Sequence, residues 1–199
     1  MTQPLPDPMP PRTPDTLALR TRNRRMLVVI AVLFLGSFAA AGVLRFSGWR
    51  PAQLKNHGEL LQPYGDLRQV QARLAGGEAY PWNPQARLWR IAVAPPPDCG
   101  ARCVALSREL DTVWQLFGRN ADHVHLLWIG EPPSGAVRNA ATRVLRDDAA
   151  LRAGLPRVDD PAGVPVYVID PNGFVVLRFA PGFDPADLRT DVARLLKLR

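Results

Sequence analysis

The sequence predicts an α/β domain, a mixed sheet with helices on both faces, preceded by one transmembrane helix. From residue 88 onward, segments of strand and helix character alternate, and a hairpin and a last helix follow. Nearer the N-terminus lies a run without charge that is close to the ~20 residues needed to cross the hydrocarbon as a helix. We therefore divide the chain into a disordered cytoplasmic tail (1–25), a transmembrane helix (26–44), a membrane-proximal arm (45–87) and the α/β domain (88–199).

The charge-free run predicts a membrane anchor that stays on the protein. A cleavable signal peptide has a shorter apolar region (~7–15 residues) that starts nearer the beginning of the chain. Here a proline-rich leader with little apolar periodicity comes first, and its composition predicts disorder. Arginines are denser before the run than after it, so the positive-inside rule places the N-terminus in the cytoplasm. The rest of the chain then lies in the periplasm of a bacterium or in the intermembrane space of a mitochondrion.

The basic charge balance does not indicate a nucleic-acid partner. The chain has 25 Lys and Arg residues against 18 Asp and Glu residues, a formal net charge of +7. Much of this excess lies in the arginines that flank the anchor. The other basic residues are interleaved with acidic ones and form no stripe, so we expect no nucleic acid. The anchor instead implies contact with the lipid bilayer through residues 26–44.

The arm carries weak structural signals. We expect a loop with two anchoring leucines at 56–61 and a short helix at 69–74. Turns are expected where glycines and prolines cluster, at 76–77 and 81–84.

The domain alternates strands and helices. Short apolar runs predict strands at 88–94, 124–129, 166–169 and 174–179. Between the last two strands, Asp-Pro-Asn-Gly at 170–173 predicts a tight turn and an antiparallel hairpin, because proline fixes one φ and glycine accepts a positive one. Apolar residues at helical spacing predict helices at about 101–117, around 137–145, and after Asp184, which caps the last helix ahead of Pro185.

The two cysteines of the chain, Cys99 and Cys103, stand where the first strand of the domain gives way to its first helix. Free backbone N–H groups and the helix dipole favour a negative sulfur there; Arg102 adds to this effect and Asp98 opposes it. A structural disulfide that closes such a short loop would add little stability. The pair therefore predicts thiol–disulfide exchange, with an exposed Cys99 as the attacking thiol and Cys103 as the resolving thiol.

This order of elements, with a cysteine pair between the first strand and the first helix, resembles the thioredoxin fold. Residues 163–169 (Gly-Val-Pro-Val-Tyr-Val-Ile) also resemble the thioredoxin segment in which a cis-proline precedes the third strand. The resemblance implies that Pro165 lies opposite the cysteines in the cis form. It also implies that the backbone preceding Pro165 forms a wall of the substrate groove.

The three residues between the cysteines resemble the Sco family, membrane-anchored thioredoxin-like proteins of cytochrome c oxidase assembly. The anchor, the pair Cys99 and Cys103, and residues 167–173 carry this resemblance. Residues 56–61 and 195–197 are similar to an uncharacterised Sco-like branch encoded in proteobacterial oxidase gene clusters. The resemblance implies a bacterial inner-membrane protein whose partner is an oxidase subunit or another assembly factor.

The chain departs from the Sco pattern at the copper site. Sco proteins bind copper with both cysteines and a histidine about five positions before the aromatic residue of the third strand; that position is Ala162 here. Val104 stands where a proline normally follows the second cysteine. Two thiolates alone, Cys99 and Cys103, would give Cu(I) a two-coordinate site.

The three histidines are weak substitutes for the missing ligand. His123 and His125 lie at the start of the second strand, the end of the sheet away from the cysteines. His57 belongs to the arm, and nothing in the sequence requires it at the site.

Three hypotheses follow for Cys99 and Cys103. The first is an assembly factor for cytochrome c oxidase that acts as a thiol–disulfide oxidoreductase on a partner's copper-site cysteines and requires no cofactor. The second is a Cu(I) chaperone that uses both sulfurs. The third is a non-catalytic scaffold that keeps the fold.

Overall fold

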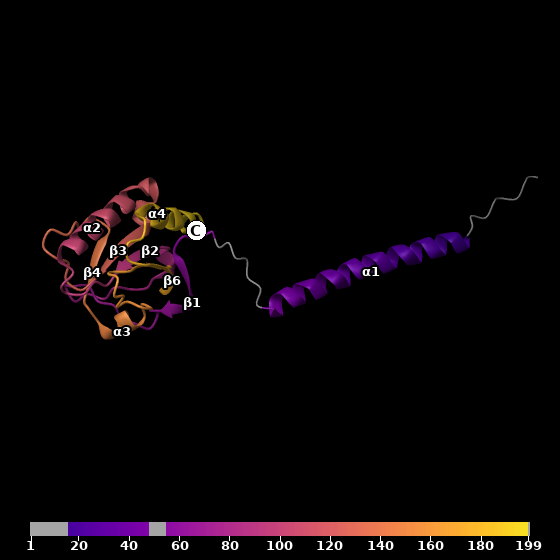
Figure 1. Cartoon of the computed structure of the whole chain (residues 1–199), viewed down its shortest axis with the longest axis horizontal. Helices are drawn as coiled ribbons and strands as arrows, with labels where there is room; N and C mark the ends of the chain where they lie inside the picture. Colours follow the sequence, from indigo (N-terminus) through magenta and orange to yellow (C-terminus); the bar gives the residue numbers. More distant parts are fainter. Residues whose placement is uncertain (1–15, 48–54, 199) are drawn as a thin grey trace, which may run out of the picture. The chain divides into compact units, whose positions relative to one another are not determined.

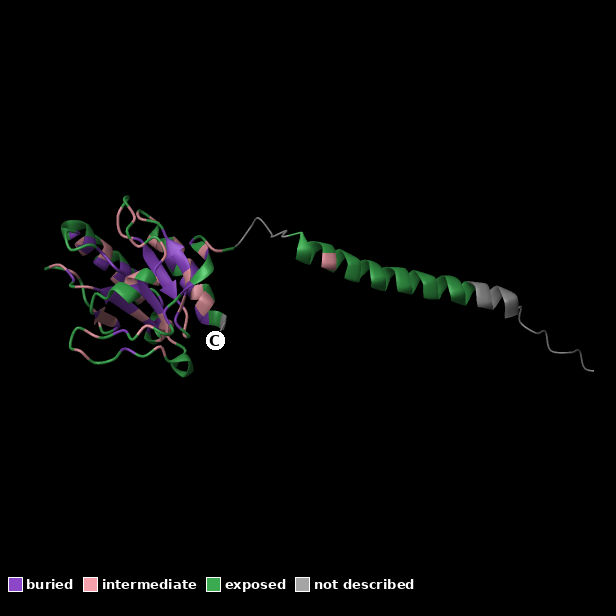
Figure 2. Ribbon diagram, turned by 90° about the horizontal axis from the view of Figure 1, so that it is seen from below, coloured by how far each residue is buried: buried purple, intermediate pink, exposed green. Residues whose placement is uncertain are grey.

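The computed structural model describes residues 16–47 and 55–198, and the chain divides into two compact units, residues 1–53 and 54–199. In the first unit, α1 (Thr16–Phe46) is one uninterrupted helix (Figure 1). Its Arg22–Phe46 part has a mean hydropathy of 2.7 and is a candidate membrane span, as the sequence predicts. Its apolar side chains are exposed, as Figure 2 shows.

The helix begins earlier than the apolar run does. The prediction of a disordered tail is wrong for residues 16–25, which are helical, while residues 1–15 lie outside the described part. Leucine, alanine and arginine dominate positions 17–25, and these residues favour helix. Because extending a helix costs much less than nucleating one, α1 also includes the residues on the N-terminal side of the apolar run.

The second unit contains a six-stranded mixed sheet in the order β1-β6-β5-β2-β3-β4. The strands β2, β3 and β4 are parallel, whereas β5, β6 and β1 each pair antiparallel with their neighbours. The strand bounds are β1 Glu59–Asp66, β2 Trp89–Val93, β3 Val124–Ile129, β4 Thr142–Leu145, β5 Val166–Ile169 and β6 Phe174–Phe179. The predicted mixed sheet is thus confirmed.

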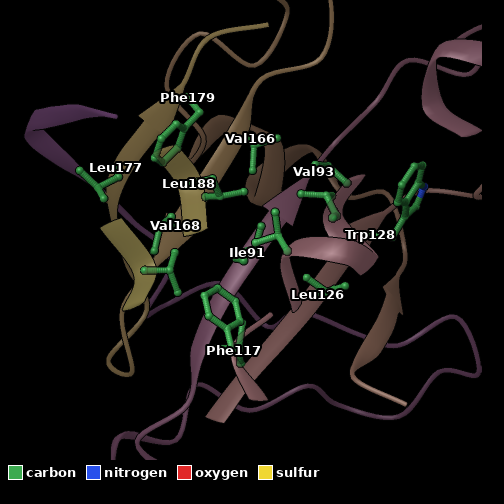
Figure 3. Close-up of a cluster of buried hydrophobic side chains, with 14 of the residues drawn as sticks. Ile91, Val93, Phe117, Leu126, Trp128, Val166, Val168, Leu177, Phe179 and Leu188 are labelled. Atoms are coloured by element: carbon green, nitrogen blue, oxygen red, sulfur yellow. The ribbon is translucent and has the colours of Figure 1, made fainter. Parts of the chain in front are cut away.

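Helices cover one face of the sheet, and a short helix and irregular chain cover the other. The helices are α2 (Gly100–Gln115), α3 (Ala149–Ala153) and α4 (Pro185–Leu195), with 3-10 turns at Pro84–Ala86, Gly118–His123 and Leu196–Leu198. Alternate side chains of β2 serve opposite faces: Ile91 and Val93 pack under α2 and α4, whereas Ala92 packs under α3 and residues 67–80. Figure 3 shows the first cluster, where Leu188 of α4 lies among strand side chains.

The predicted turn and helix cap are both present. The backbone N–H of Gly173, which has φ +105°, donates to the carbonyl of Asp170 and closes the hairpin between β5 and β6. Asp184 accepts a hydrogen bond from the Ala186 N–H, and Pro185 opens α4.

The prediction of a helix around 137–145 is wrong. Val144 and Leu145 belong to β4, where they pair in parallel with Trp128 and Ile129 of β3. Helical structure begins only at α3, which Asp148 caps. Apolar residues three or four positions apart suit a helix, but the same spacing arises when a loop leads into a short buried strand.

The arm contributes a strand to the sheet. Residues 59–66 form edge strand β1, so the loop predicted at 56–61 is wrong for residues 59–61, and no helix forms at 69–74. Pro63 lies within β1, which is tolerated because an edge strand leaves one side unpaired. The compact unit therefore begins near Leu54, well before the predicted boundary at residue 88.

Candidate functional site

The cysteine pair lies at the N-terminus of α2, where the sequence predicts it. Cys99 immediately precedes the helix, and Cys103 lies one turn further inside it. A turn bond from the Cys99 N–H to the carbonyl of Pro96 brings the chain from β2 to this point. Gly100 then has φ +53°, a left-handed conformation that favours glycine, so the chain can enter α2 directly after Cys99.

Cys99 and Cys103 form a disulfide, with 5.5 Å between their Cα atoms. Cys99 is 5% exposed and Cys103 is fully buried within the apolar core under α2 and α4. The expectation of an exposed Cys99 is therefore wrong, because the packing of α2 against the core buries both cysteines. The two sulfurs are nevertheless not equivalent, because Cys99 borders a cavity that Cys103 does not line.

This cavity has a volume of about 400 Å³. One wall is the N-terminal half of α2, and the others are the segment before β5 and the segment between β6 and α4. The lining residues are Cys99, Arg102, Ala105, Leu106 and Glu109 from α2, then Ala162, Gly163 and Val164, then Pro181, Gly182 and Phe183. Charged groups, Arg102 and Glu109, thus stand on an otherwise apolar surface, whereas the exposed Asp98 does not line it.

The backbone that precedes Pro165 forms part of this cavity, as the resemblance to thioredoxin implies. Pro165 itself does not line it, and the prediction of a cis bond is wrong: the Val164–Pro165 bond is trans. Among the described residues the cis peptide bond is Gln62–Pro63. Gly163 has φ +142°, and a Cβ at this position would lie 3.3 Å from the Cβ of Pro181. Glycine therefore lets the two wall segments meet.

Comparison with known proteins identifies the family of the domain that carries this site. The family model described as "Transmembrane-like, thioredoxin-like, C-terminal domain" matches residues 89–199, which contain the disulfide and all three walls of the cavity. The chain belongs to this family. No curated protein matches the chain.

Solved structures with the same thioredoxin-like fold include BsSco, a member of the Sco family of cytochrome c oxidase assembly proteins. BsSco has 10% identity and a TM-score of 0.51, and the match covers 71% of this chain and 98% of BsSco. Trgpx in its apo form has 14% identity and a TM-score of 0.50, covering 66% and 95% respectively. Yeast Sco1 with copper bound has 13% identity and a TM-score of 0.48, covering 76% and 96%. At these identities the likeness to BsSco and Trgpx shows the fold alone.

Among the described residues, no histidine lines the cavity beside the disulfide. Ala162, the position that the Sco resemblance assigns to a copper-binding histidine, does line the cavity with Cys99. Within residues 16–47 and 55–198, no group of three or more His, Cys, Asp or Glu side chains could hold a metal ion. When the disulfide is reduced, Cys99 and Cys103 can bind Cu(I) as a pair of thiolates, without a third ligand from the cavity.

The histidines have other partners. The ring of His57 lies between Asp191, 3.1 Å from its Nδ1, and Asp187, 3.4 Å from its Nε2. The Nδ1 of His125 lies 2.8 Å from the hydroxyl of Tyr80. Burial, followed by the positive charges of Arg143 and Arg90, lowers the pKa of His125 to about 4. His123 ends the 3-10 turn before β3.

Sequence reasoning missed the buried Arg90, which is 1% exposed on β2. Its Nη1 donates to the carbonyls of Leu88, Asp170 and Pro171, and its Nε donates to the hydroxyl of Tyr80. The guanidinium also lies 5.3 Å from the ring centroid of Trp82, within cation–π range. The sequence pattern of β2 does not predict a buried arginine, because the hydrogen-bond partners of Arg90 are mostly groups from distant segments of the chain.

The sequence also missed the third wall of the cavity, Pro181–Phe183. These residues follow β6, and only the antiparallel pairing of β6 with β5 brings them alongside the segment before β5. Proline and glycine at 181 and 182 are the signal for a loop, but not for its place next to Cys99.

Proposed function

We propose that this chain is a membrane-anchored, thioredoxin-like assembly factor for cytochrome c oxidase that handles thiols of a partner's copper site. The observation that carries the proposal is the Cys99–Cys103 disulfide at the start of α2, with one sulfur bordering a cavity and the other buried. This asymmetry suits an attacking Cys99 and a resolving Cys103.

The reaction transfers two electrons from the reduced pair to a partner disulfide. The Cys99 thiolate attacks one partner sulfur, the partner's S–S bond breaks, and a mixed disulfide forms. The Cys103 thiolate then attacks Sγ of Cys99 and releases the partner as a dithiol. The product is the disulfide seen in the structure, which a dithiol protein in the same compartment reduces again.

The location proposed is the bacterial inner membrane, with one span, a cytoplasmic N-terminus and a periplasmic domain. The candidate span Arg22–Phe46 and the arginines on its N-terminal side support this orientation. A periplasmic domain would also experience an oxidising environment, in which a disulfide persists.

The proposed partner is a subunit of cytochrome c oxidase or another assembly factor. Support comes from the shared fold with BsSco, a cytochrome c oxidase assembly protein with a disulfide switch. The bilayer is contacted through the anchor, and nucleic acid has no part in the proposal.

Trapping in cells tests this function. Cys103→Ser leaves Cys99 able to attack but removes the resolving thiol, so a mixed disulfide with the partner should accumulate and be visible on non-reducing gels. Cys99→Ser with Cys103→Ser is the matched control and should trap nothing. An absence of any trapped complex, together with normal oxidase assembly in the double variant, would favour the non-catalytic scaffold.

A second candidate function is carriage of Cu(I) by the reduced pair. The specific observation in its favour is the closeness of the two sulfurs, which two-coordinate Cu(I) accepts. Anaerobic titration of the reduced protein with Cu(I) distinguishes the two functions. One tightly bound ion with a nitrogen ligand would contradict the redox proposal, whereas weak binding through sulfur alone supports it.

A further inference from the structure

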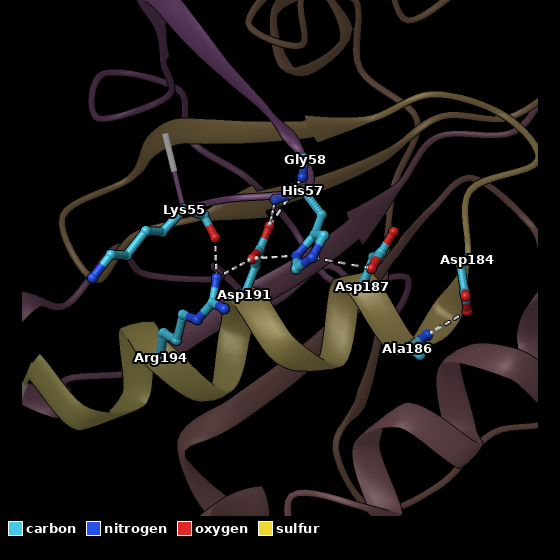
Figure 4. Close-up of polar contacts among 8 residues, drawn as sticks. All are labelled: Lys55, His57, Gly58, Asp184, Ala186, Asp187, Asp191 and Arg194. Atoms are coloured by element: carbon cyan, nitrogen blue, oxygen red, sulfur yellow. Dashed lines mark hydrogen bonds and ion pairs between the residues drawn. The ribbon is translucent and has the colours of Figure 1, made fainter. Parts of the chain in front are cut away.

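Asp191 is a buried carboxylate on α4 that contacts the beginning of the domain. Only 2% of its surface is exposed. Its Oδ2 accepts the backbone N–H groups of His57 at 2.6 Å and of Gly58 at 2.9 Å. Its Oδ1 lies 3.1 Å from Nδ1 of His57 and 3.3 Å from Nη1 of Arg194 (Figure 4). A single side chain of α4 thus binds the residues that lead into β1.

Polar bonds hold residues 55–58 beside a second cavity. Arg194 also donates to the carbonyl of Lys55. This second cavity has a volume of about 400 Å³ and is bordered by Lys55, Asn56 and Asp191. Because a cavity supplies few van der Waals contacts, polar contacts attach this segment to α4. Asp191 makes three of them, with His57 and Gly58. Asp187 adds an ion pair to His57, and Arg194 adds the bond to Lys55.

On its other side the segment contacts Phe179. A Cβ on Gly58 would lie 2.6 Å from Cζ of Phe179, so the backbone at Gly58 lies directly against this ring. The ring of Phe179 packs against Phe183, with 5.5 Å between centroids. Phe183 in turn borders the cavity next to Cys99. Continuous contacts therefore connect Asp191 with the cavity beside the disulfide.

We propose that Asp191 is a positioning residue for the Cys99 cavity. By holding Gly58 against Phe179, it keeps Phe183 in place and restricts access to the sulfur of Cys99. This inference rests on the proposed function, because the cavity matters for exchange only if Cys99 reacts with a partner.

The test is the rate at which dithiothreitol reduces the disulfide in the full chain reconstituted in lipid nanodiscs. The reductant's thiolates break the Cys99–Cys103 bond, two cysteine thiols form, and the reductant leaves as its cyclic disulfide. Asp191→Asn should raise this rate roughly threefold or more, since access controls the rate of exchange. Gly58→Ala, which presses on Phe179 while Asp191 remains, should raise the rate as well.

Leu151→Ala is the matched control, because Leu151 is 1% exposed in the core on the opposite face of the sheet. It should lower the free energy of unfolding and leave the reduction rate unchanged. If Asp191→Asn also lowers stability without changing the rate, Asp191 is only structural and the inference is wrong. Faster reduction in Asp191→Asn, with no complex trapped by Cys103→Ser, would instead keep this inference and overturn the proposed function.

Discussion

The hydroxyl of Tyr80 connects the arm to the sheet by accepting a hydrogen bond from Nε of Arg90 on β2, at 3.2 Å. Since the arginine can only donate, the Tyr80 hydroxyl gives its own proton to Nδ1 of His125, 2.8 Å away. Burial raises the pKa of Tyr80, so it stays protonated. The arrangement holds a cation, a phenol and a neutral imidazole together at the amino end of β2 and β3.

Removing the cation should destabilise the domain strongly. Arg90→Met leaves the carbonyls of Asp170 and Pro171 and the hydroxyl of Tyr80 without their buried donor. We expect a loss of about 2–4 kcal/mol in the free energy of unfolding, measured by urea titration. Arg108→Met, at an exposed position on α2, is the control and should change the free energy by less than about 0.5 kcal/mol. Equal effects of the two variants would contradict this account of Arg90.

Acid should weaken the fold through His125. Its pKa is lowered from 6.5 to about 4, so below pH 6.5 the unfolded chain binds a proton that the folded chain refuses. The contribution of His125 to the free energy of unfolding is therefore fully present above pH 6.5, its pKa in the unfolded chain. This contribution decreases below pH 6.5 and is lost as the pH falls through about 4, its pKa in the folded chain. Urea midpoints between about pH 7 and pH 4.5 measure it.

His125→Gln provides the comparison, because glutamine still offers an acceptor to Tyr80 but does not titrate. The variant should show a flatter dependence on pH than the natural chain over the same range. Parallel curves for the two proteins would show that His125 is not responsible and that carboxylates dominate the acid response.

Three strands could be predicted at their observed bounds. The segments 124–129, 166–169 and 174–179 are short apolar runs rich in β-branched and aromatic residues, with turn residues beside them. Edge strands gave weaker signals. The sequence of β1 contains Pro63 and Gly65, and its pairing with β6 shifts register between Leu60 and Gly65, so little strict alternation remains.

The parts of the site that lie within short sequence motifs could be predicted. The sequence pattern located Cys99 and Cys103 at the start of a helix, and the resemblance located residues 162–164 beside them. The wall at Phe183 and the carboxylate of Asp191 depend on how β6 and α4 pack, and a single sequence does not contain that information.

Gly163→Ala should cost more stability than Gly182→Ala. Both glycines have positive φ, +142° and +78°, but a Cβ on Gly163 would contact Pro181 whereas one on Gly182 meets open space. We expect about 1–3 kcal/mol for Gly163→Ala and about 1 kcal/mol for Gly182→Ala, from thermal unfolding of both variants. A smaller cost at Gly163 would show that the two wall segments do not need their close contact.

Ala162→His should convert the cavity into a copper site of higher affinity. Ala162 lines the same cavity as Cys99, and an imidazole there would give Cu(I) a nitrogen ligand in addition to the two thiolates. With the disulfide reduced, we expect the variant to bind Cu(I) roughly tenfold more tightly than the natural chain, measured by competition with a chromophoric Cu(I) chelator. Ala162→Gln has a side chain of comparable length without an imidazole and should leave the affinity unchanged. If Ala162→His binds no more tightly than Ala162→Gln, then position 162 does not direct its side chain toward the sulfurs, and the correspondence with the copper-binding histidine of Sco proteins fails.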